Sequence, residues 1–177
     1  MKKRILGVFL LAAVLLICGV VFSQGQKKED GATRESREAL LDQAISHSKG
    51  TQWTIATETT LEDHIISGAY SSDGKATLAV FDPLGDGKYE FSSSVNREQD
   101  DIVIDTTAIN GTRYNLIWFC GAQTEYAEAT YIVNGELLPV ERFDTTNMDI
   151  ICVKIDATAK EYSSHIVYYD SQGNRYE

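Results

Sequence analysis

The clearest structural signal in this sequence is the stretch IVIDTTAINGTRYNLIWFC, residues 102–120. It contains two runs rich in β-branched and aromatic side chains, which favour β-strands. Asn110-Gly111 separates the runs, and this pair suits the two left-handed positions of a type I′ turn. The stretch therefore predicts a β-hairpin.

Further strand-like runs lie on both sides of this hairpin. A second Asn-Gly pair, Asn134-Gly135, joins two of them, and the others are expected at residues 52–57, 64–70, 75–82, 88–95, 148–155 and 163–169. No helical pattern is interleaved, which favours antiparallel over parallel sheets. We predict a mainly β protein of about eight to nine strands. It would be either an antiparallel β-sandwich of immunoglobulin-like architecture or a small barrel.

One short amphipathic helix is expected before the strands, over residues 33–50. Leucine, alanine and isoleucine recur there at helical spacing, and Gly50 follows as a stop signal. The preceding residues 24–32 are polar and are typical of a linker. The β-domain is therefore expected to span residues 51–177.

The first 23 residues form a separate unit. A basic start, MKKR, precedes ILGVFLLAAVLLICGVVF, residues 5–22, which contains no charged side chain. As a helix this run would be about 27 Å long, close to the hydrocarbon thickness of a bilayer. We predict that residues 1–23 are a hydrophobic helix that serves as a signal peptide or membrane anchor. The side chains expected to insert are Leu10, Leu11, Val14, Leu15 and Leu16.

Three fates of this segment stay open. It can remain as an uncleaved anchor, be cleaved after Ser23, or carry a lipid at Cys18. Basic residues are more numerous before the apolar run than after it. Positive flanks stay on the cytoplasmic side, so the rest of the chain is expected outside the cytoplasm, anchored to the membrane or secreted.

The charge balance limits the partners. The chain has 16 Lys and Arg against 26 Asp and Glu, a formal net charge of −10. Nucleic-acid binding depends on neutralising phosphates with basic side chains, so no nucleic acid is expected. Contact with the membrane is assigned to the N-terminal segment, because anionic lipid headgroups repel an acidic body.

Two cysteines, Cys120 and Cys152, fall in the β-domain. Outside the cytoplasm they could form one disulfide. The alternative is a pair of buried thiols, since cysteine is among the most buried residue types.

Metal binding has one candidate site. Asp144, Asn147 and Asp149 group three oxygen-bearing side chains in one loop, and calcium prefers such ligands. The spacing differs from that of an EF-hand, and Asp and Asn are also common turn residues. No cofactor is predicted.

Catalytic motifs are not evident. The three histidines lie far apart in the sequence, and no G-x-S-x-G motif is present. Tyr126 and Tyr131 fall on opposite faces of one expected strand, and exposed tyrosines suit contact with a protein or a glycan. We predict a non-enzymatic binding or envelope-sensing module. The alternatives are a small cell-envelope hydrolase or metal-dependent enzyme, and an assembly subunit that pairs through strand edges.

The overall plan has three parts: a leader or anchor, a short helix and a β-domain with Asn-Gly hairpins. This plan is similar to that of many surface proteins of Gram-positive bacteria. The resemblance supports a place at the bacterial cell surface and transfers no site residue.

Overall fold

A computed structural model describes residues 30–45, 50–98, 102–121, 124–147 and 149–175. The chain is mainly antiparallel β, with one α-helix, α2 (Arg34–Ile45), inside the range expected for a helix. The expected hydrophobic helix lies outside the described residues, and with it Cys18 and the side chains expected to insert: Leu10, Leu11, Val14, Leu15 and Leu16. Among the residues that are described, no helix is long and apolar enough to cross a membrane.

Eleven strands are described, and they form three sheets. The first sheet has the order β1-β2-β3-β4, with β1 (Trp53–Leu61), β2 (His64–Ser71), β3 (Lys75–Gly85) and β4 (Lys88–Glu98). The second has the order β10-β6-β5, with β5 (Val103–Ile109), β6 (Thr112–Trp118) and β10 (Ile150–Lys154). The third sheet consists of β7 (Tyr126–Val133), β8 (Glu136–Leu137), β9 (Glu141–Asp144) and β11 (Tyr162–Tyr169). Its central strand is β7, which pairs with β11, β8 and β9.

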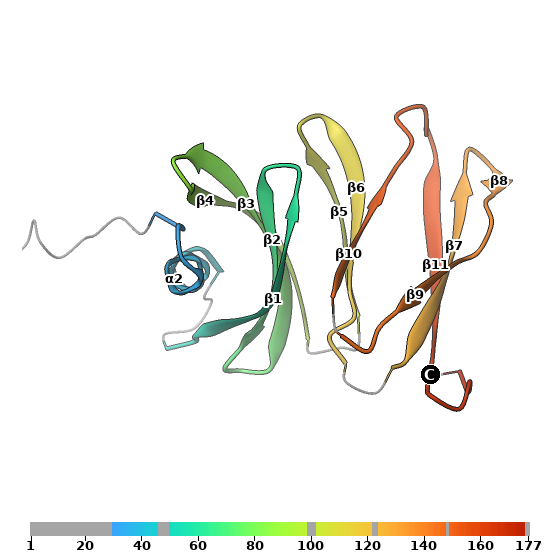
Figure 1. Cartoon of the computed structure of the whole chain (residues 1–177), viewed down its shortest axis with the longest axis horizontal. Helices are drawn as coiled ribbons and strands as arrows, with labels where there is room; N and C mark the ends of the chain where they lie inside the picture. The colour runs from blue at the N-terminus through green and yellow to red at the C-terminus, as the bar shows by residue number, and fades with distance from the viewer. Residues whose placement is uncertain (1–29, 46–49, 99–101, 122–123, 148, 176–177) are drawn as a thin grey trace, which may run out of the picture.

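The helix and the three sheets lie side by side as successive layers, with α2 at one end and the third sheet at the other (Figure 1). Every strand pairing is antiparallel. The sheets are open, so the small barrel considered from the sequence is wrong. Two sheets suffice for a sandwich, and the third sheet is an additional layer.

The two Asn-Gly turns have the backbone that the sequence predicts. Asn110 and Gly111 have φ of 49° and 78°, and Asn134 and Gly135 have φ of 52° and 83°. Both residues of each turn are thus left-handed, as a type I′ turn requires. The strand after the second turn is short: β8 ends at Leu137, before Pro139, which has no N–H for the ladder, and β9 begins only at Glu141.

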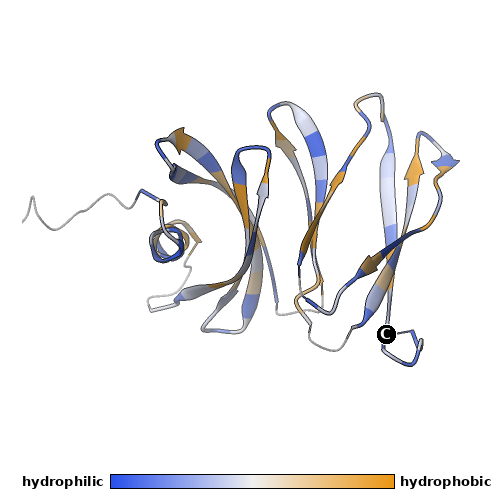
Figure 2. Ribbon diagram, viewed as in Figure 1, coloured by the Kyte–Doolittle hydropathy of each residue, from blue (hydrophilic) through white to orange (hydrophobic). Residues whose placement is uncertain are grey.

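The middle sheet is buried on both faces. On β6, Leu116 and Trp118 belong to the core shared with the first sheet, whereas Ile117 belongs to the core shared with the third sheet. This explains why the segment from Leu116 to Cys120 is apolar without alternation: neither face of the strand meets water. Figure 2 shows hydrophobic residues on facing strands of the layers and again on the outer segment beside β8.

The first and second sheets approach closely at Gly68. A Cβ atom on Gly68 would lie 2.5 Å from Cε2 of Trp118, so the indole packs directly on the backbone of β2. The first sheet packs on α2 through its other face, where Leu41 and Ile45 of the helix meet Trp53 and Phe81. This packing joins the helix to the first sheet through a core of their own.

Candidate functional site

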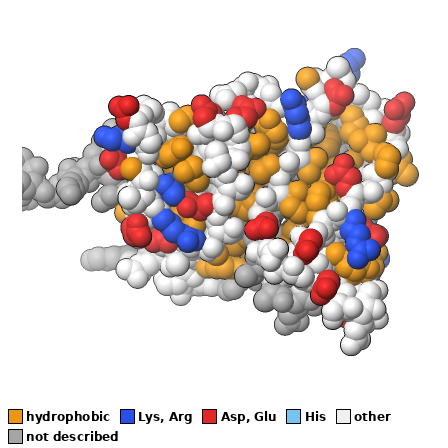
Figure 3. Space-filling view, in the orientation of Figure 1, with side chains coloured by type: hydrophobic (Ala, Val, Ile, Leu, Met, Phe, Trp, Pro, Cys, Tyr) orange, Lys and Arg blue, Asp and Glu red, His pale blue; other side chains and the backbone are white. Residues whose placement is uncertain are grey.

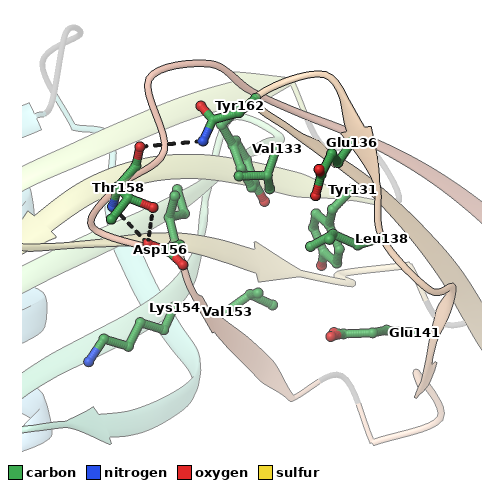
Figure 4. Close-up of a pocket in the computed structure, with 12 residues that line it drawn as sticks. Tyr131, Val133, Glu136, Leu138, Glu141, Val153, Lys154, Asp156, Thr158 and Tyr162 are labelled. Atoms are coloured by element: carbon green, nitrogen blue, oxygen red, sulfur yellow. Dashed lines mark hydrogen bonds between the residues drawn. The ribbon is translucent and has the colours of Figure 1, made fainter.

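A cavity of about 400 Å³ lies between β10 of the second sheet and the third sheet (Figure 4). Elsewhere these two sheets share a core of apolar side chains, including Phe119 and Ala127. Toward the Asn134 turn the facing side chains no longer fill the space. A concave space of this size, lined by both apolar and polar side chains, is a candidate small-molecule site.

The floor of the cavity carries two tyrosines from neighbouring strands. Alternation along β7 turns Tyr131 inward and Ile132 outward, and their exposed fractions are 2% and 43%. Tyr162 begins β11, opposite Val133 in the register. The rings of Tyr131 and Tyr162 are stacked, with centroids 5.9 Å apart and an interplanar angle of 28°.

The hydroxyl groups of these tyrosines are buried. Tyr131 Oη makes no hydrogen bond within the part of the chain that the structure describes, and the Tyr162 hydroxyl lies beside the Asn115 and Ser164 side chains. Burial raises the pKa of Tyr131, and electrostatic interaction with Tyr162 and with Glu141 acts in the same direction. Burial also raises the pKa of Tyr162, although the nearby Asn115 and Ser164 side chains act in the opposite direction. Both phenols are therefore neutral at pH 7.

The third sheet also supplies two carboxylates to the cavity lining. Glu136 comes from β8 and Glu141 from the start of β9, with Pro139 between them. The backbone N–H of Leu138 donates a hydrogen bond of 2.9 Å to the Tyr131 carbonyl, which holds this segment beside β7. Among the described residues, neither Glu136 nor Glu141 forms an ion pair.

The loop at the opposite wall is held by its own hydrogen bonds. Oδ1 of Asp156 accepts hydrogen bonds of 2.7 Å from the backbone N–H and the hydroxyl of Thr158. Oδ1 of Asn134 accepts bonds from the backbone N–H groups of Lys160 and Glu161. Both side chains thus shape the cavity wall, so its remaining polar groups are those of the tyrosines, Glu136, Glu141 and Lys154.

The two cysteines of the β-domain are not joined by a disulfide. Cys152 pairs in register with Leu116, four residues before Cys120 on the neighbouring strand. Four residues of a strand cover about 13 Å, whereas bridged Cα atoms lie within about 7 Å. Cys120 is buried and Cys152 is half-buried, and both side chains pack in the core between the first and second sheets.

The calcium candidates take part in a turn. Oδ1 of Asp144 accepts hydrogen bonds from the backbone N–H and the hydroxyl of Thr146, 2.9 and 2.6 Å long. Asn147 and Asp149 follow on either side of residue 148, which is not described. Within the described ranges, no group of three or more His, Cys, Asp or Glu side chains could hold a metal ion.

The histidines are placed separately. His64 is buried at the start of β2, with Nδ1 2.8 Å from Asp63 and Nε2 3.4 Å from Asp82. His165 is exposed on β11, and His47 lies outside the described residues. The contacts of His64 tie β2 to the turn before it and to β3.

Tyr126 and Tyr131 lie on opposite faces of β7, as the sequence predicts. Tyr126 stacks on Tyr169 on the outer face of the third sheet, with ring centroids 4.7 Å apart. The Arg142 guanidinium covers Tyr126 at 3.5 Å from the ring centroid. Arg142 therefore covers one face of the stacked Tyr126–Tyr169 pair, whereas Tyr131 faces the cavity.

The fold and the cavity define an antiparallel β protein with a candidate ligand site between two of its sheets. Comparison with known proteins adds no name to this class: the sequence matches no protein-family model and no curated protein, and the fold matches no solved structure. The functional argument therefore depends on the residues of this chain alone.

Proposed function

We propose that this protein is a non-enzymatic binding module whose ligand site is the cavity between β10 and the third sheet. The observation that carries the proposal is the pair of stacked tyrosines, Tyr131 and Tyr162, which line the cavity, together with the buried Tyr131 hydroxyl, which has no hydrogen-bond partner among the described residues. A buried hydroxyl without a partner costs about 1–3 kcal/mol of stability. A ligand that pairs with it recovers this cost, which favours binding at this place.

The module is proposed to act outside the cytoplasm, secreted or held at the membrane by residues 1–23. Support comes from the basic start and the uncharged apolar run of residues 5–22. The described residues begin with Asp30, inside the expected linker, and α2 is part of the same core as the first sheet. A short tether would thus hold the folded body close to the membrane surface.

We also propose that the first two sheets are the sandwich unit expected from the sequence, with immunoglobulin-like architecture as its type. The support is their shared core, in which Leu78 and Val80 of β3 meet Val103, Leu116 and Trp118. The third sheet then adds the wall that creates the cavity. In this division, the core between the first and second sheets stabilises the fold, and the interface between the second and third sheets binds the ligand.

A second candidate function is assembly with another chain through a strand edge. It is favoured by an exposed apolar cluster, here named the β8 apolar patch, which consists of Ile132, Leu137, Leu138 and Val140. Their exposed fractions are between 40% and 69%. Figure 3 shows hydrophobic side chains gathered at the β8 end of the molecule. Such patches at sheet edges are frequent sites of protein–protein contact.

The proposed function is tested by a thermal-shift screen of the full chain in a mild non-ionic detergent. The compounds should include small neutral, cationic and anionic molecules, sugars and envelope fragments. A ligand at a hundred times its dissociation constant stabilises the protein by about 2.7 kcal/mol, which is readily measured.

The matched control is Tyr131→Phe, which removes only the unpaired hydroxyl. This variant is expected to be at least as stable as the wild type without ligand, and to show a smaller ligand-induced shift. A screen without any shift that depends on Tyr131 would contradict the proposed site.

A further inference from the structure

We propose that the cavity recognises a small organic cation: an ammonium group carried on an apolar body. This inference rests on the proposed function, because it names the ligand chemistry of the same cavity. It is carried by the carboxylates of Glu136 and Glu141 together with the buried hydroxyl of Tyr131.

The charges of the lining favour a cation. Glu136, Glu141 and Asp156 are acidic, and Lys154 is the only basic residue among the lining residues. Figure 4 shows the Lys154 side chain pointing away from the other labelled residues, whereas the Glu141 side chain lies at the lower edge of the group, with its carboxylate turned to the side on which Val153 lies. Glu136 and Glu141 are exposed and form no ion pair with described residues, so both carboxylates are available to the ammonium group of a ligand that enters from solvent.

The buried hydroxyl of Tyr131 is an independent observation. Its residue is 2% exposed and lines the cavity, and its oxygen has no hydrogen-bond partner among the described residues. Glu141 lines the same cavity as the two tyrosines. An ammonium group has three N–H donors, so it can donate to a phenol oxygen and to a carboxylate together. The aromatic rings add a cation–π attraction.

The remaining walls fit an apolar body. Val133, Leu138, Val153 and Ile155 surround the tyrosine pair, and the cavity of about 400 Å³ has room for one small molecule. An anion would meet repulsion from Glu136 and Glu141. A neutral molecule of the same shape would fill the space but leave these carboxylates without a counter-charge.

The test compares three probes of nearly equal shape by isothermal titration calorimetry on the full chain in non-ionic detergent. They are phenethylammonium, 2-phenylethanol and phenylacetate. The cation is expected to bind at least tenfold more tightly than the neutral alcohol, and phenylacetate more weakly than both. A fourth probe, Nα-acetyl-lysine methylamide, distinguishes two sources of the ammonium group. If this probe binds more tightly than phenethylammonium, the source is a polypeptide; if it binds more weakly, the source is a free amine.

Two variants assign the effect to the cavity. Glu141→Gln is expected to abolish most of the tenfold preference for the cation, whereas Glu98→Gln, which removes an equal charge at the far end of the first sheet, is expected to preserve it. Equal binding of cation and alcohol would overturn the cation inference and leave the binding cavity intact. Unchanged cation affinity in Glu141→Gln would also overturn it. Binding of none of the probes would contradict the proposed function itself.

Discussion

The carboxylate of Glu38 on α2 accepts a hydrogen bond of 2.8 Å from the backbone N–H of Ile55 on β1. Asp42, one turn further along the helix, accepts a bond of 2.7 Å from the N–H of Trp53. Arg34, one turn earlier, donates to the Ile55 carbonyl. Because β1 is at the edge of the first sheet, these three side chains occupy backbone groups that would otherwise be open to another strand.

The helix is therefore expected to prevent edge-to-edge association. The double substitution Glu38→Ala and Asp42→Ala should uncover two N–H groups of β1 and promote dimers or larger species, which light scattering detects. Each lost bond to a charged group should also cost about 1.5–3 kcal/mol of stability in urea unfolding. Gln43→Ala, at an exposed position of the same helix, is the control, and a fully monomeric double variant would contradict this role.

The ion pair between Arg37 and Glu58 should make stability depend on pH. Arg37 is buried, and its guanidinium nitrogens donate bonds of 2.9 and 2.8 Å to the two Glu58 oxygens. Burial by itself would raise the pKa of Glu58, but the hydrogen bonds from Arg37 and Ser67 outweigh it, and the pKa is lowered. The stability from this pair is thus complete above the unfolded-state pKa of about 4.3, and it is lost as pH falls through the lower folded-state pKa.

Glu58→Gln is the variant that measures this effect. At pH 7 it should lower the free energy of unfolding by on the order of 3 kcal/mol, because Arg37 stays buried without its counter-charge. The difference from the wild type should shrink below about pH 4. Urea unfolding at several pH values measures it, and an undiminished difference at pH 3 would be inconsistent with the assigned pair.

Gly68→Ala should disrupt the contact between the first two sheets. The added methyl group would lie 2.5 Å from the Trp118 ring, closer than non-bonded atoms approach. Overpacking of this kind costs about 1–3 kcal/mol. In a Trp118→Leu background the same substitution should cost much less, since the indole that it meets is gone. Chemical denaturation of the wild type, the two single variants and the double variant measures the coupling energy between the two positions. Equal costs of Gly68→Ala in both backgrounds would show that Trp118 is not the obstacle.

The thiols of the β-domain should react slowly in the folded protein. Burial raises the pKa of Cys152 to about 11, so little thiolate exists at pH 8. In a chain carrying Cys18→Ser, an aromatic disulfide reagent should modify Cys120 and Cys152 quickly only after denaturation. A mass two hydrogens lower under non-reducing conditions would reveal a disulfide and contradict this placement.

The β8 apolar patch should control association if the assembly function holds. Leu137→Lys adds a charge at the most exposed of its four residues, 69% exposed, and should abolish any concentration-dependent dimer seen by light scattering. The fold should be unaffected, because this side chain faces solvent. Leu84→Lys, at an exposed leucine of the first sheet, is the matched control. Dimers that persist in Leu137→Lys would place the contact elsewhere.

The local sequence determined the strands and turns of this protein. A two-residue type I′ turn requires left-handed backbone at both positions, which Asn and Gly adopt readily. Asn110-Gly111 and Asn134-Gly135 therefore determine the two hairpin turns, however the strands pack in the tertiary structure. Alternation likewise set the opposite directions of Tyr126 and Tyr131 on β7. The helix was also evident, although Arg37 on its buried face was not expected from hydrophobic spacing.

Tertiary structure decided which faces meet. The unbroken apolar run at the end of β6 was the one sequence sign of a layer buried on both sides, but only packing shows that three sheets are stacked. The cavity gathers side chains from β7, β8, β9, β10 and β11. Of its principal residues, only Tyr131 was singled out beforehand, since Glu136, Glu141 and Tyr162 carry no motif. Their proximity follows from strand pairing between distant segments, which short-range physical preferences do not specify.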